Sequence, residues 1–236
     1  MTKPQKLVWG IGGASLATGI GAWQIGSPAI SLLLAWTSLS CAGATLAYAT
    51  NRPGWYGKRR GKLVWWRAAP SAVFLLAFRI ACGCMRLVRK HPPRSRINPW
   101  LWVAGRLNES QVPEGVDYVV DLVAEFPEPQ SMRERSGYRF LGVLDGHTPP
   151  DQDAVLELLD ELATPGSKVL VHCDSGMGRA PSLAALLLLR RGATADLPEA
   201  ITTIQRARPF IHLGRAEMDF LEQIAPRVPL GSPPSG

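Results

Sequence analysis

The residues best suited to chemistry lie in one short stretch, HCDSGMGR, which runs from His172 to Arg179. The apolar run at 169–171 before it indicates a buried strand, and the residues after Arg179 indicate a helix. A loop that enters the N-terminus of a helix presents free backbone N–H groups and the positive end of the helix dipole. Gly176 and Gly178 allow the backbone to curl, so that successive amides can point inward around an anion.

This loop predicts a phosphate-binding site with a nucleophile at its base. The amides and the guanidinium of Arg179 favour the thiolate of Cys173, which is the nucleophilic form of cysteine. Arg179 can also donate two parallel hydrogen bonds to phosphate oxygens. His172 is expected to support Cys173 through hydrogen bonds in the loop, the alternative being a packed histidine at the end of a strand. The residues expected to surround the phosphate are Asp174, Ser175, Gly176, Met177 and Gly178.

The pattern HC-x5-R, with glycine at its usual place (HCxxGxxR), resembles the protein tyrosine phosphatase superfamily and is most similar to its compact dual-specificity branch. The likeness extends over roughly 97–225. VLDGHTPP at 143–150 resembles the mobile loop that carries the general acid of that family, and ARPFIH at 207–212 resembles its arginine-proline segment. VVDLVAEFPEP at 119–129 looks like a strand and loop of bacterial and mitochondrial-type members, some of which act on phospholipids.

The resemblance implies a fold, a mechanism and a set of catalytic residues. The fold is α/β, with a central, mostly parallel sheet flanked by helices. Cys173 is the nucleophile and forms a cysteinyl-phosphate, Arg179 holds the phosphate, and Asp145 is the general acid, with no metal or other cofactor. The implied substrates are phosphomonoesters. Proteins phosphorylated on tyrosine, serine or threonine and a phospholipid phosphate all stay open.

Two departures from the family pattern qualify this reading. Ala180 stands where the family has Ser or Thr, whose hydroxyl helps the cysteine to leave in the second step. The alternative function is therefore a pseudophosphatase, a module that recognises phosphate at the membrane without hydrolysing it. Asp174 would repel a phosphate dianion if it pointed inward, so we expect it to point out of the loop. Asp151 and Asp153 are alternatives to Asp145 as the acid.

Other polar residues near the motif are expected to have ordinary structural roles. Glu125 and Glu128 lie in the loop after a strand and are expected to be solvated charges. His147 is interpreted as a loop residue. Arg208 is expected to cap a helix or to add positive charge near the site.

The elements that must position these residues follow from hydrophobic patterns. Strands are predicted at 100–105, 115–124, 138–145 and 168–173. Helices are predicted at 151–163, 180–192, 197–208 and 215–225. Together they form a catalytic domain over 97–225, followed by a tail at 226–236 whose proline, glycine and serine content predicts disorder.

The N-terminal part of the chain differs sharply in charge from this domain. All 19 acidic residues lie beyond residue 100, whereas residues 1–100 hold 14 of the 26 basic ones. No charged residue occurs from Leu7 to Thr50. This stretch suits two membrane spans, at 7–23 and 29–50, whose many small residues favour close helix packing. We therefore predict a two-helix transmembrane hairpin with a basic flank over 1–62, in preference to a cleaved signal peptide.

The segment 63–96 is predicted to be a basic interfacial or re-entrant segment. Arg67 and Arg79 interrupt its apolar run, which argues for a helix in the membrane plane over a third span. The positive charges on both sides of the hairpin place both of its ends, and the catalytic domain, in the cytoplasm of a multi-pass membrane protein. They also predict anionic lipids, not nucleic acid, as partners. The chain's four cysteines imply no disulfide framework, and the sequence does not define an oligomeric state.

Overall fold

The computed structural model describes residues 3–25 and 27–230. Its centre is a five-stranded sheet of β3 (Arg94–Asn98), β4 (Leu101–Ala104), β5 (Tyr118–Val123), β6 (Tyr138–Val143) and β7 (Val169–His172). The strand order is β3-β4-β7-β5-β6, with β3 antiparallel to β4 and the other neighbours parallel. The four predicted strands and the mostly parallel sheet are confirmed. The edge strand β3 was not predicted, and it extends the sheet beyond the expected boundary at residue 97.

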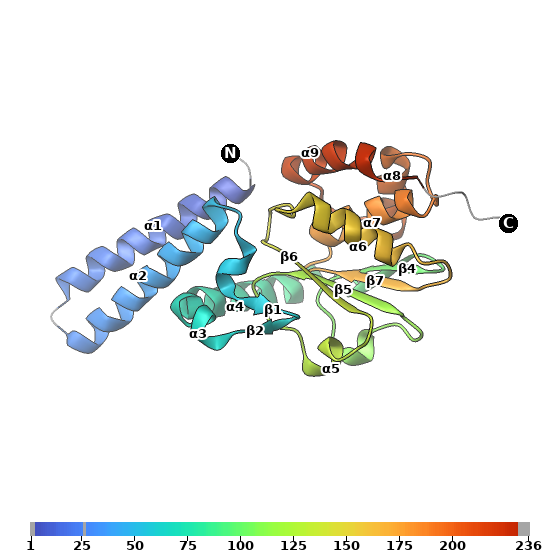
Figure 1. The fold of residues 1–236 in the computed structure, drawn as a ribbon. Helices are drawn as coiled ribbons and strands as arrows, with labels where there is room; N and C mark the ends of the chain where they lie inside the picture. Colours follow the sequence, from blue (N-terminus) through green and yellow to red (C-terminus); the bar gives the residue numbers. More distant parts are fainter. Residues whose placement is uncertain (1–2, 26, 231–236) are drawn as a thin grey trace.

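Helices cover both faces of this sheet (Figure 1). On one face lie α6 (Gln152–Leu162), α7 (Arg179–Arg190), α8 (Leu197–Ala207) and α9 (Arg215–Ile224), which match the four predicted helices. The short α5 (Gln130–Arg133) lies on the other face, and η3 (Glu109–Gln111) and η4 (Ala225–Arg227) are single turns.

The core lies between β7, β5 and the helix α7. All four residues of β7 are buried, as is α7 from Arg179 to Leu189. Both faces of β7 pack into buried clusters, with Val169 and Val171 on one side and Leu170 on the other. This explains why β7 is a continuous apolar run, since strands covered on both faces have no polar side. The carboxyl ends of the parallel strands meet at one edge, because Ala104 and Asp121 both align with His172. Ligands of open α/β sheets bind at this edge.

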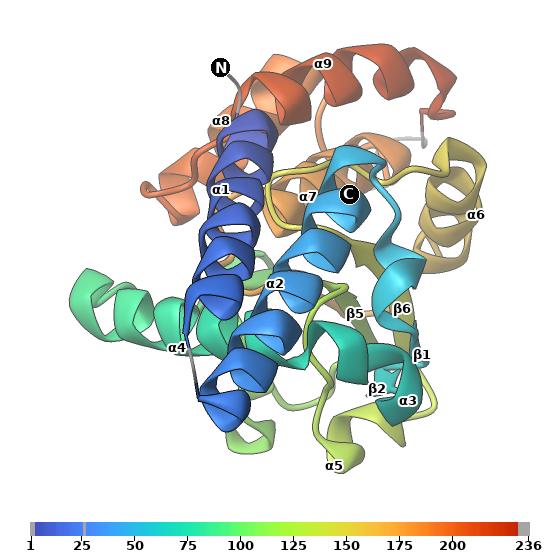
Figure 2. The same cartoon turned by 90° about the vertical axis from the view of Figure 1, so that its left-hand side faces the viewer.

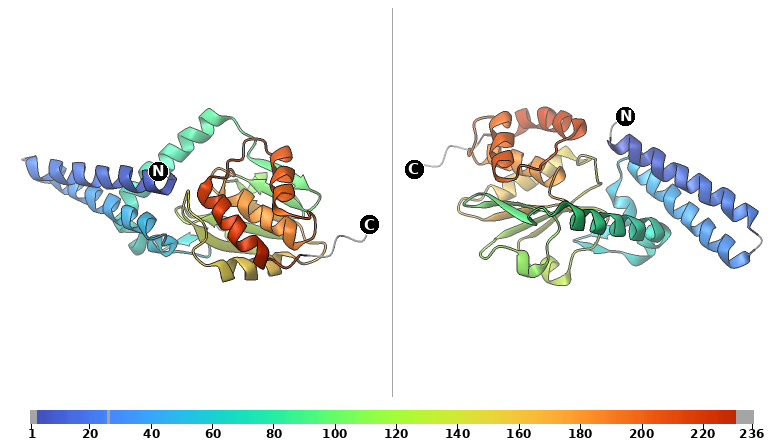
Figure 3. Two further views of the ribbon diagram at one scale, coloured as in Figure 1. Left: turned by 90° about the horizontal axis from the view of Figure 1, so that it is seen from above. Right: turned by 180° about the vertical axis from the view of Figure 1, so that it is seen from behind.

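The chain begins with a helical hairpin of α1 (Lys3–Gln24) and α2 (Pro28–Ala49), which projects from the domain (Figures 1 and 3). Its helices pack through small residues. The hydroxyls of Ser15 and Ser38 each donate to the other residue's carbonyl oxygen at 2.8 Å. Large apolar side chains face outward, among them Trp9, Leu16, Trp23, Leu32 and Leu33.

Two helices in the described part of the chain are long and apolar enough to cross a membrane. One is α2, with a mean hydropathy of 1.6, and it matches the second predicted span. The other runs over Trp65–Arg89, with a mean hydropathy of 1.8, and contains α3 (Trp65–Ala68), η2 (Ala69–Ser71) and α4 (Ala72–Arg89). α1 is not one of the two. Figures 2 and 3 show α4 running across the direction of the hairpin rather than alongside it. The transmembrane hairpin and the in-plane segment stay predictions.

The basic segment after the hairpin packs on the domain built around the five-stranded sheet. It contains η1 (Pro53–Tyr56), β1 (Lys58–Arg59) and β2 (Lys62–Leu63), and the last two form a small antiparallel sheet. Lys58 was expected to be part of a basic flank, but its side chain is buried. Its ammonium group donates to Asp121 Oδ2 and to the carbonyl oxygen of Val123, both at 2.6 Å. Residues 59, 60 and 62 stay exposed.

The C-terminal segment is ordered further than predicted. η4 continues to Arg227, and Val228 is buried against the core. Residues 231–236 of the predicted tail lie outside the described residues.

Lys58→Met is expected to destabilise the whole fold. The substitution leaves the fully buried carboxylate of Asp121 without its cation, and breaking a buried ion pair in this way typically costs about 3–5 kcal/mol. Thermal or denaturant unfolding of the full-length protein in detergent measures the loss. Arg59→Met, at the exposed neighbouring position, is the matched control. Equal stability of the two variants would contradict a buried ion pair that anchors this segment.

Candidate active site

The predicted phosphate-binding loop joins β7 to α7, at the carboxyl edge of the sheet. Cys173 follows β7 directly and is 1% exposed. The backbone N–H of Gly176 donates to Cys173 Sγ at 3.1 Å, so the amides of the loop turn inward over the sulfur. Gly176 has a φ of +68°, and a Cβ there would lie 2.6 Å from the backbone of Gly105. The loop of residues 173–179 therefore needs glycine at this position.

Arg208 braces the 173–179 loop from behind. Its guanidinium donates to the carbonyl oxygens of Gly176 at 2.7 Å and Ser175 at 3.3 Å. The backbone N–H of His212 adds a hydrogen bond to the carbonyl oxygen of Met177 at 2.8 Å. Burial lowers the pKa of Arg208 to about 10, which leaves it charged at neutral pH. Arg208 ends α8, as expected, but its main contacts are with the loop, and its place in the segment ARPFIH was the signal for this role.

Arg179 is the first residue of α7, and its guanidinium is buried at the carboxyl ends of β5 and β6. It donates to the carbonyl oxygen of Val143 at 2.6 Å and to Glu125 Oε2 at 3.2 Å, and it lies 3.4 Å from Asp145 Oδ1. Burial opposes its charge, but Glu125 and Asp145 outweigh this cost, so the pKa of Arg179 is raised.

Glu125 was predicted to be a solvated charge, and this is wrong. It is fully buried, because its two carboxylate oxygens accept hydrogen bonds from three segments. Oε1 accepts from the backbone N–H of Asp145 at 2.6 Å and from the hydroxyl of Tyr48 at 3.0 Å, while Oε2 accepts from Arg179. The sequence around Glu125 carries no sign of these distant partners.

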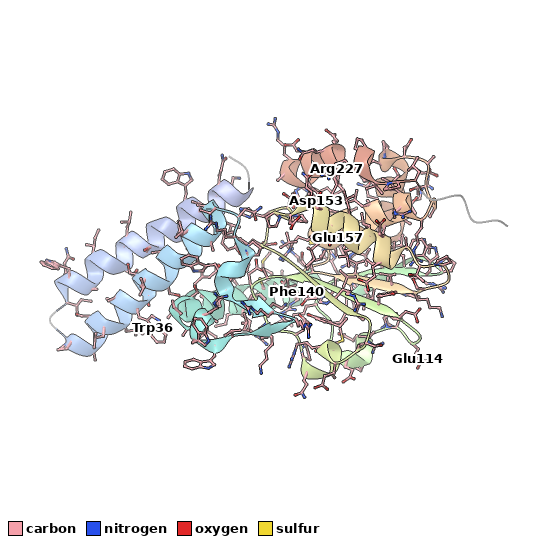
Figure 4. The ribbon with its side chains drawn as sticks, viewed as in Figure 1. Trp36, Glu114, Phe140, Asp153, Glu157 and Arg227 are labelled. Carbon is pink, nitrogen blue, oxygen red and sulfur yellow. The ribbon has the colours of Figure 1, made fainter. Side chains whose placement is uncertain are left out.

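The three candidate acids lie in different places. Asp145 lines the cleft beside the 173–179 loop and pairs with Arg179. Asp151 caps α6 by accepting from the backbone N–H of Ala154 at 3.0 Å. Asp153 pairs with Arg227 at 2.6 Å, and Figure 4 shows both side chains at the outer surface. Of the three, Asp145 is the acid that the structure brings to the site.

The cleft over the 173–179 loop has a volume of about 350 Å³, and α4 forms one of its walls. Arg86 Nη1 lies 3.9 Å from Asp174 Oδ1, and Arg89 donates to the sulfur of Met177 at 3.1 Å. Asp174 therefore pairs with α4 across the cleft. The α4 side chains along the cleft are Phe78, Ala81, Cys82, Met85, Arg86 and Arg89.

His172 lies beneath the loop in a buried cluster with Asp121 and Glu128. Ligand atoms of these three residues lie within 4.8 Å of one another, a spacing that a metal ion could use. Each of the two acids already has a cationic side chain beside it, in the place of the charge that a metal ion would supply. Lys58 contacts Asp121, and Arg106 Nη2 lies 3.4 Å from Glu128 Oε1. Glu128 is buried, which corrects its expected solvation.

Among the described residues, the ring nitrogens of His172 make no hydrogen bond of ordinary geometry, although the adjacent backbone of Cys173 still favours the protonated ring. The predicted support of Cys173 by His172 stays a prediction. Burial lowers the pKa of His172 to about 4, and the ring is therefore neutral at physiological pH. Its surroundings fit the alternative reading, a packed histidine at the end of a strand.

The fold and the loop define the class of cysteine-dependent phosphatase domains of the dual-specificity type. The family model described as "Swiss Army Knife protein, DSP-PTPase phosphatase domain" (PTP-SAK) matches residues 109–227, and the chain belongs to this family. The predicted resemblance to dual-specificity phosphatases is thereby confirmed. The match begins after β4, so the N-terminal elements lie outside it.

Individual relatives agree with this assignment. Dual specificity protein phosphatase 5 of Rattus norvegicus is 29% identical over 107 residues, which are 42% of this chain and 27% of that protein. The crystal structure of Tk-PTP in the active form is 26% identical, with a TM-score of 0.50 over 58% of this chain and 99% of its own. The structure of PTPMT1 in complex with PI(5)P shares the fold at 16% identity and a TM-score of 0.50, over 58% of this chain and 97% of its own.

The cluster of Glu128 and His172 predicts an unusual dependence of stability on pH. Burial raises the pKa of Glu128 from 4.5 to about 7 and lowers that of His172 from 6.5 to about 4. Between about pH 4.5 and 6.5, the folded state keeps a proton on Glu128 that the unfolded chain releases, so this acid's contribution to stability falls as pH rises. His172 has the opposite sign, because the unfolded chain binds a proton that the folded state excludes.

In the Glu128→Gln variant, the loss of stability with rising pH that Glu128 causes is removed, and the opposite contribution of His172 remains. Its free energy of unfolding is expected to rise between about pH 4.5 and 6.5, relative to the parent, by on the order of 1–3 kcal/mol. Thermal unfolding in detergent at a series of pH values measures this difference. Glu157→Gln, at an exposed position of α6, is the control and should follow the parent. Parallel pH profiles for the parent and Glu128→Gln would contradict the assigned shift.

Proposed function

We propose that this protein is a membrane-anchored, cysteine-dependent phosphatase that hydrolyses phosphomonoesters, with its catalytic domain in the cytoplasm. One observation carries the proposal. The sulfur of Cys173 lies at the base of a loop whose amide at Gly176 donates to it at 3.1 Å, and the guanidinium of Arg179 is held nearby by Glu125. This arrangement can bind a phosphate and supply the nucleophile without a metal ion.

In the first step, the thiolate of Cys173 attacks phosphorus in line with the leaving oxygen. The loop amides and Arg179 stabilise the charge on the three equatorial oxygens. The bond from phosphorus to the leaving oxygen breaks, and that oxygen takes a proton from Asp145, so that a neutral alcohol or phenol departs. A cysteinyl-phosphate remains on the enzyme.

In the second step, water attacks the cysteinyl-phosphate and gives a proton to Asp145, which now acts as a base. The bond from phosphorus to sulfur breaks, inorganic phosphate leaves, and the thiolate of Cys173 is restored. Ala180 is buried and offers no hydroxyl to the departing sulfur, which makes this step the slower one. The same residue favours the second candidate function, a pseudophosphatase that binds phosphate at the membrane without turnover.

The substrate is a phosphorylated membrane component, either a protein or a phospholipid. Apolar α4 side chains such as Phe78, Ala81 and Met85 line the cleft, and α4 belongs to a helix apolar enough to contact lipid. An amphiphilic phosphate ester fits both surfaces, with its phosphate in the loop and its apolar part along α4. PTPMT1, which shares the fold, was crystallised with the phospholipid PI(5)P. Exposed basic residues at 59, 60 and 62 would attract anionic lipid headgroups.

Phosphate release by the full-length protein in anionic vesicles tests the function. The vesicles carry either phospholipid phosphates or a phosphopeptide with a lipid anchor, and each substrate is also offered in soluble form. We expect turnover of the membrane-bound substrates, and Cys173→Ser should reduce it to background because a serine hydroxyl is a far weaker nucleophile at neutral pH. Tight phosphate binding with no release in the parent would support the pseudophosphatase instead.

Asp145→Asn is expected to slow the reaction on poor leaving groups much more than on good ones. A general acid matters where the departing oxygen needs a proton, and its help is worth about 10²–10⁴-fold. The measurement compares kcat/KM, which reports the first step alone, on an alkyl phosphate and on an aryl phosphate with an acidic phenol. Asp151→Asn keeps an N-cap on α6 and is the matched control. Equal losses on both substrates would remove Asp145 from the role of acid.

A further inference from the structure

We propose that the end of α2 is part of the active site, and that Tyr48 is a positioning residue that holds the loop carrying Asp145. This inference rests on the proposed phosphatase function, in which Asp145 is the general acid. It concerns the helical hairpin, whose expected role was anchoring alone. The loop in question comprises residues 145–148 and follows β6; Figure 2 shows the connection from β6 to α6 passing beside the end of α2.

The carboxylate of Glu125 joins Tyr48 to the catalytic residues. The buried hydroxyl of Tyr48 donates to Glu125 Oε1 at 3.0 Å, and the same oxygen accepts from the backbone N–H of Asp145 at 2.6 Å. The other oxygen of Glu125 accepts from Arg179 at 3.2 Å. Glu125 thus contacts all three parts at once: the backbone of Asp145, the guanidinium of Arg179 and the end of the hairpin at Tyr48.

Two further contacts fasten the 145–148 loop to the hairpin. The ring Nε2 of His147 lies 2.8 Å from the carbonyl oxygen of Tyr48, and the two rings meet edge to face at 5.5 Å. The side-chain amide of Asn51 donates to the carbonyl oxygen of Thr148 at 3.1 Å. The loop is therefore held by residues 48–51 along its length, in contrast to the mobile loop that the family resemblance implied.

These contacts bear on chemistry because proton transfer is sensitive to placement. A general acid must come within hydrogen-bonding reach of the leaving oxygen. Without the Tyr48 hydroxyl, Glu125 would stay buried with one donor fewer, and a buried acceptor that loses its partner is costly. The carboxylate would then shift toward its remaining donors, and the backbone of Asp145 would move with it.

Tyr56 provides a control for packing. Its side chain is also fully buried at the junction between the N-terminal segment and the domain, and its ring stacks on Phe74, which Tyr48 contacts edge-on. Among the described residues, the hydroxyl of Tyr56 has no hydrogen-bond partner. Tyr48→Phe and Tyr56→Phe therefore each remove one buried hydroxyl, but only the first removes a hydrogen bond to Glu125.

The first test is kinetic and uses full-length variants in anionic vesicles. Tyr48→Phe should lower kcat/KM on an alkyl phosphate by about tenfold, part of the roughly 10²–10⁴-fold that a general acid supplies in the first step. The loss on an aryl phosphate with a good leaving group should be much smaller. Tyr56→Phe should match the parent on both. Equal losses on the two substrates, or no loss, would overturn the proposal.

The second test does not depend on turnover. Hydrogen exchange of the full-length protein should show faster exchange at Asp145 and along the 145–148 loop in Tyr48→Phe, by about fivefold for one lost hydrogen bond. Tyr56→Phe should leave that loop unchanged. Unchanged exchange in Tyr48→Phe would overturn the positioning role whether or not the parent hydrolyses phosphate, and an inactive parent with the expected exchange would count against the proposed function alone.

A second substitution keeps the inference testable if Tyr48→Phe does not fold. Asn51→Gly removes the contact with Thr148, and glycine suits the positive φ of 47° at this position. This variant should show the same preference for good leaving groups and the same faster exchange in the 145–148 loop. Parent-like behaviour of Asn51→Gly in both measurements would overturn the proposal in that case.

Discussion

The buried contact between Arg179 and Glu125 is the interaction on which the rest of the site depends. Both side chains have left water, so each must find its hydrogen bonds inside the protein. Arg179 has to approach Glu125 and the carbonyl oxygen of Val143, and this requirement sets where α7 begins relative to β6. The 173–179 loop must then close over Cys173 between a strand and a helix that are both fixed. A phosphate would meet donors that are already in place.

The same constraint explains why the N-terminal part of the chain packs on the domain. Two acids of the sheet region, Asp121 and Glu125, are fully buried, and the domain supplies only some of their hydrogen bonds. Lys58 and Tyr48 provide the rest. The uneven charge of the sequence, with every acidic residue beyond position 100, therefore has a structural consequence. The N-terminal segment and the phosphatase domain are thus joined through buried hydrogen bonds at two acids, Asp121 and Glu125.

Sequence reasoning predicted what depends on local pattern. Three features follow one another in the chain: the apolar run of β7, the glycines of the 173–179 loop and the helix after Arg179. Each is determined mainly by residues close to it in the sequence. The partners of Glu125 could not be predicted, because Arg179 and Tyr48 lie 54 and 77 residues away. Hydropathy predicted that 63–85 contacts the membrane, but it cannot show that one face of α4 turns toward the protein. The edge strand β3 was missed because RSRIN is mostly polar.

Asp174 shows how α4 affects the electrostatics of the loop. A carboxylate next to the nucleophile opposes both the thiolate and a bound phosphate. Here it turns toward Arg86 of α4, 3.9 Å away, and its charge is balanced outside the loop. The pair is partly open to water, so its own contribution to stability is small, about 0–1 kcal/mol. Its effect on the site is larger, since the direction of Asp174 decides the sign of the charge at the mouth of the cleft. Because α4 carries that arginine, the position of α4 affects how strongly the loop attracts an anion.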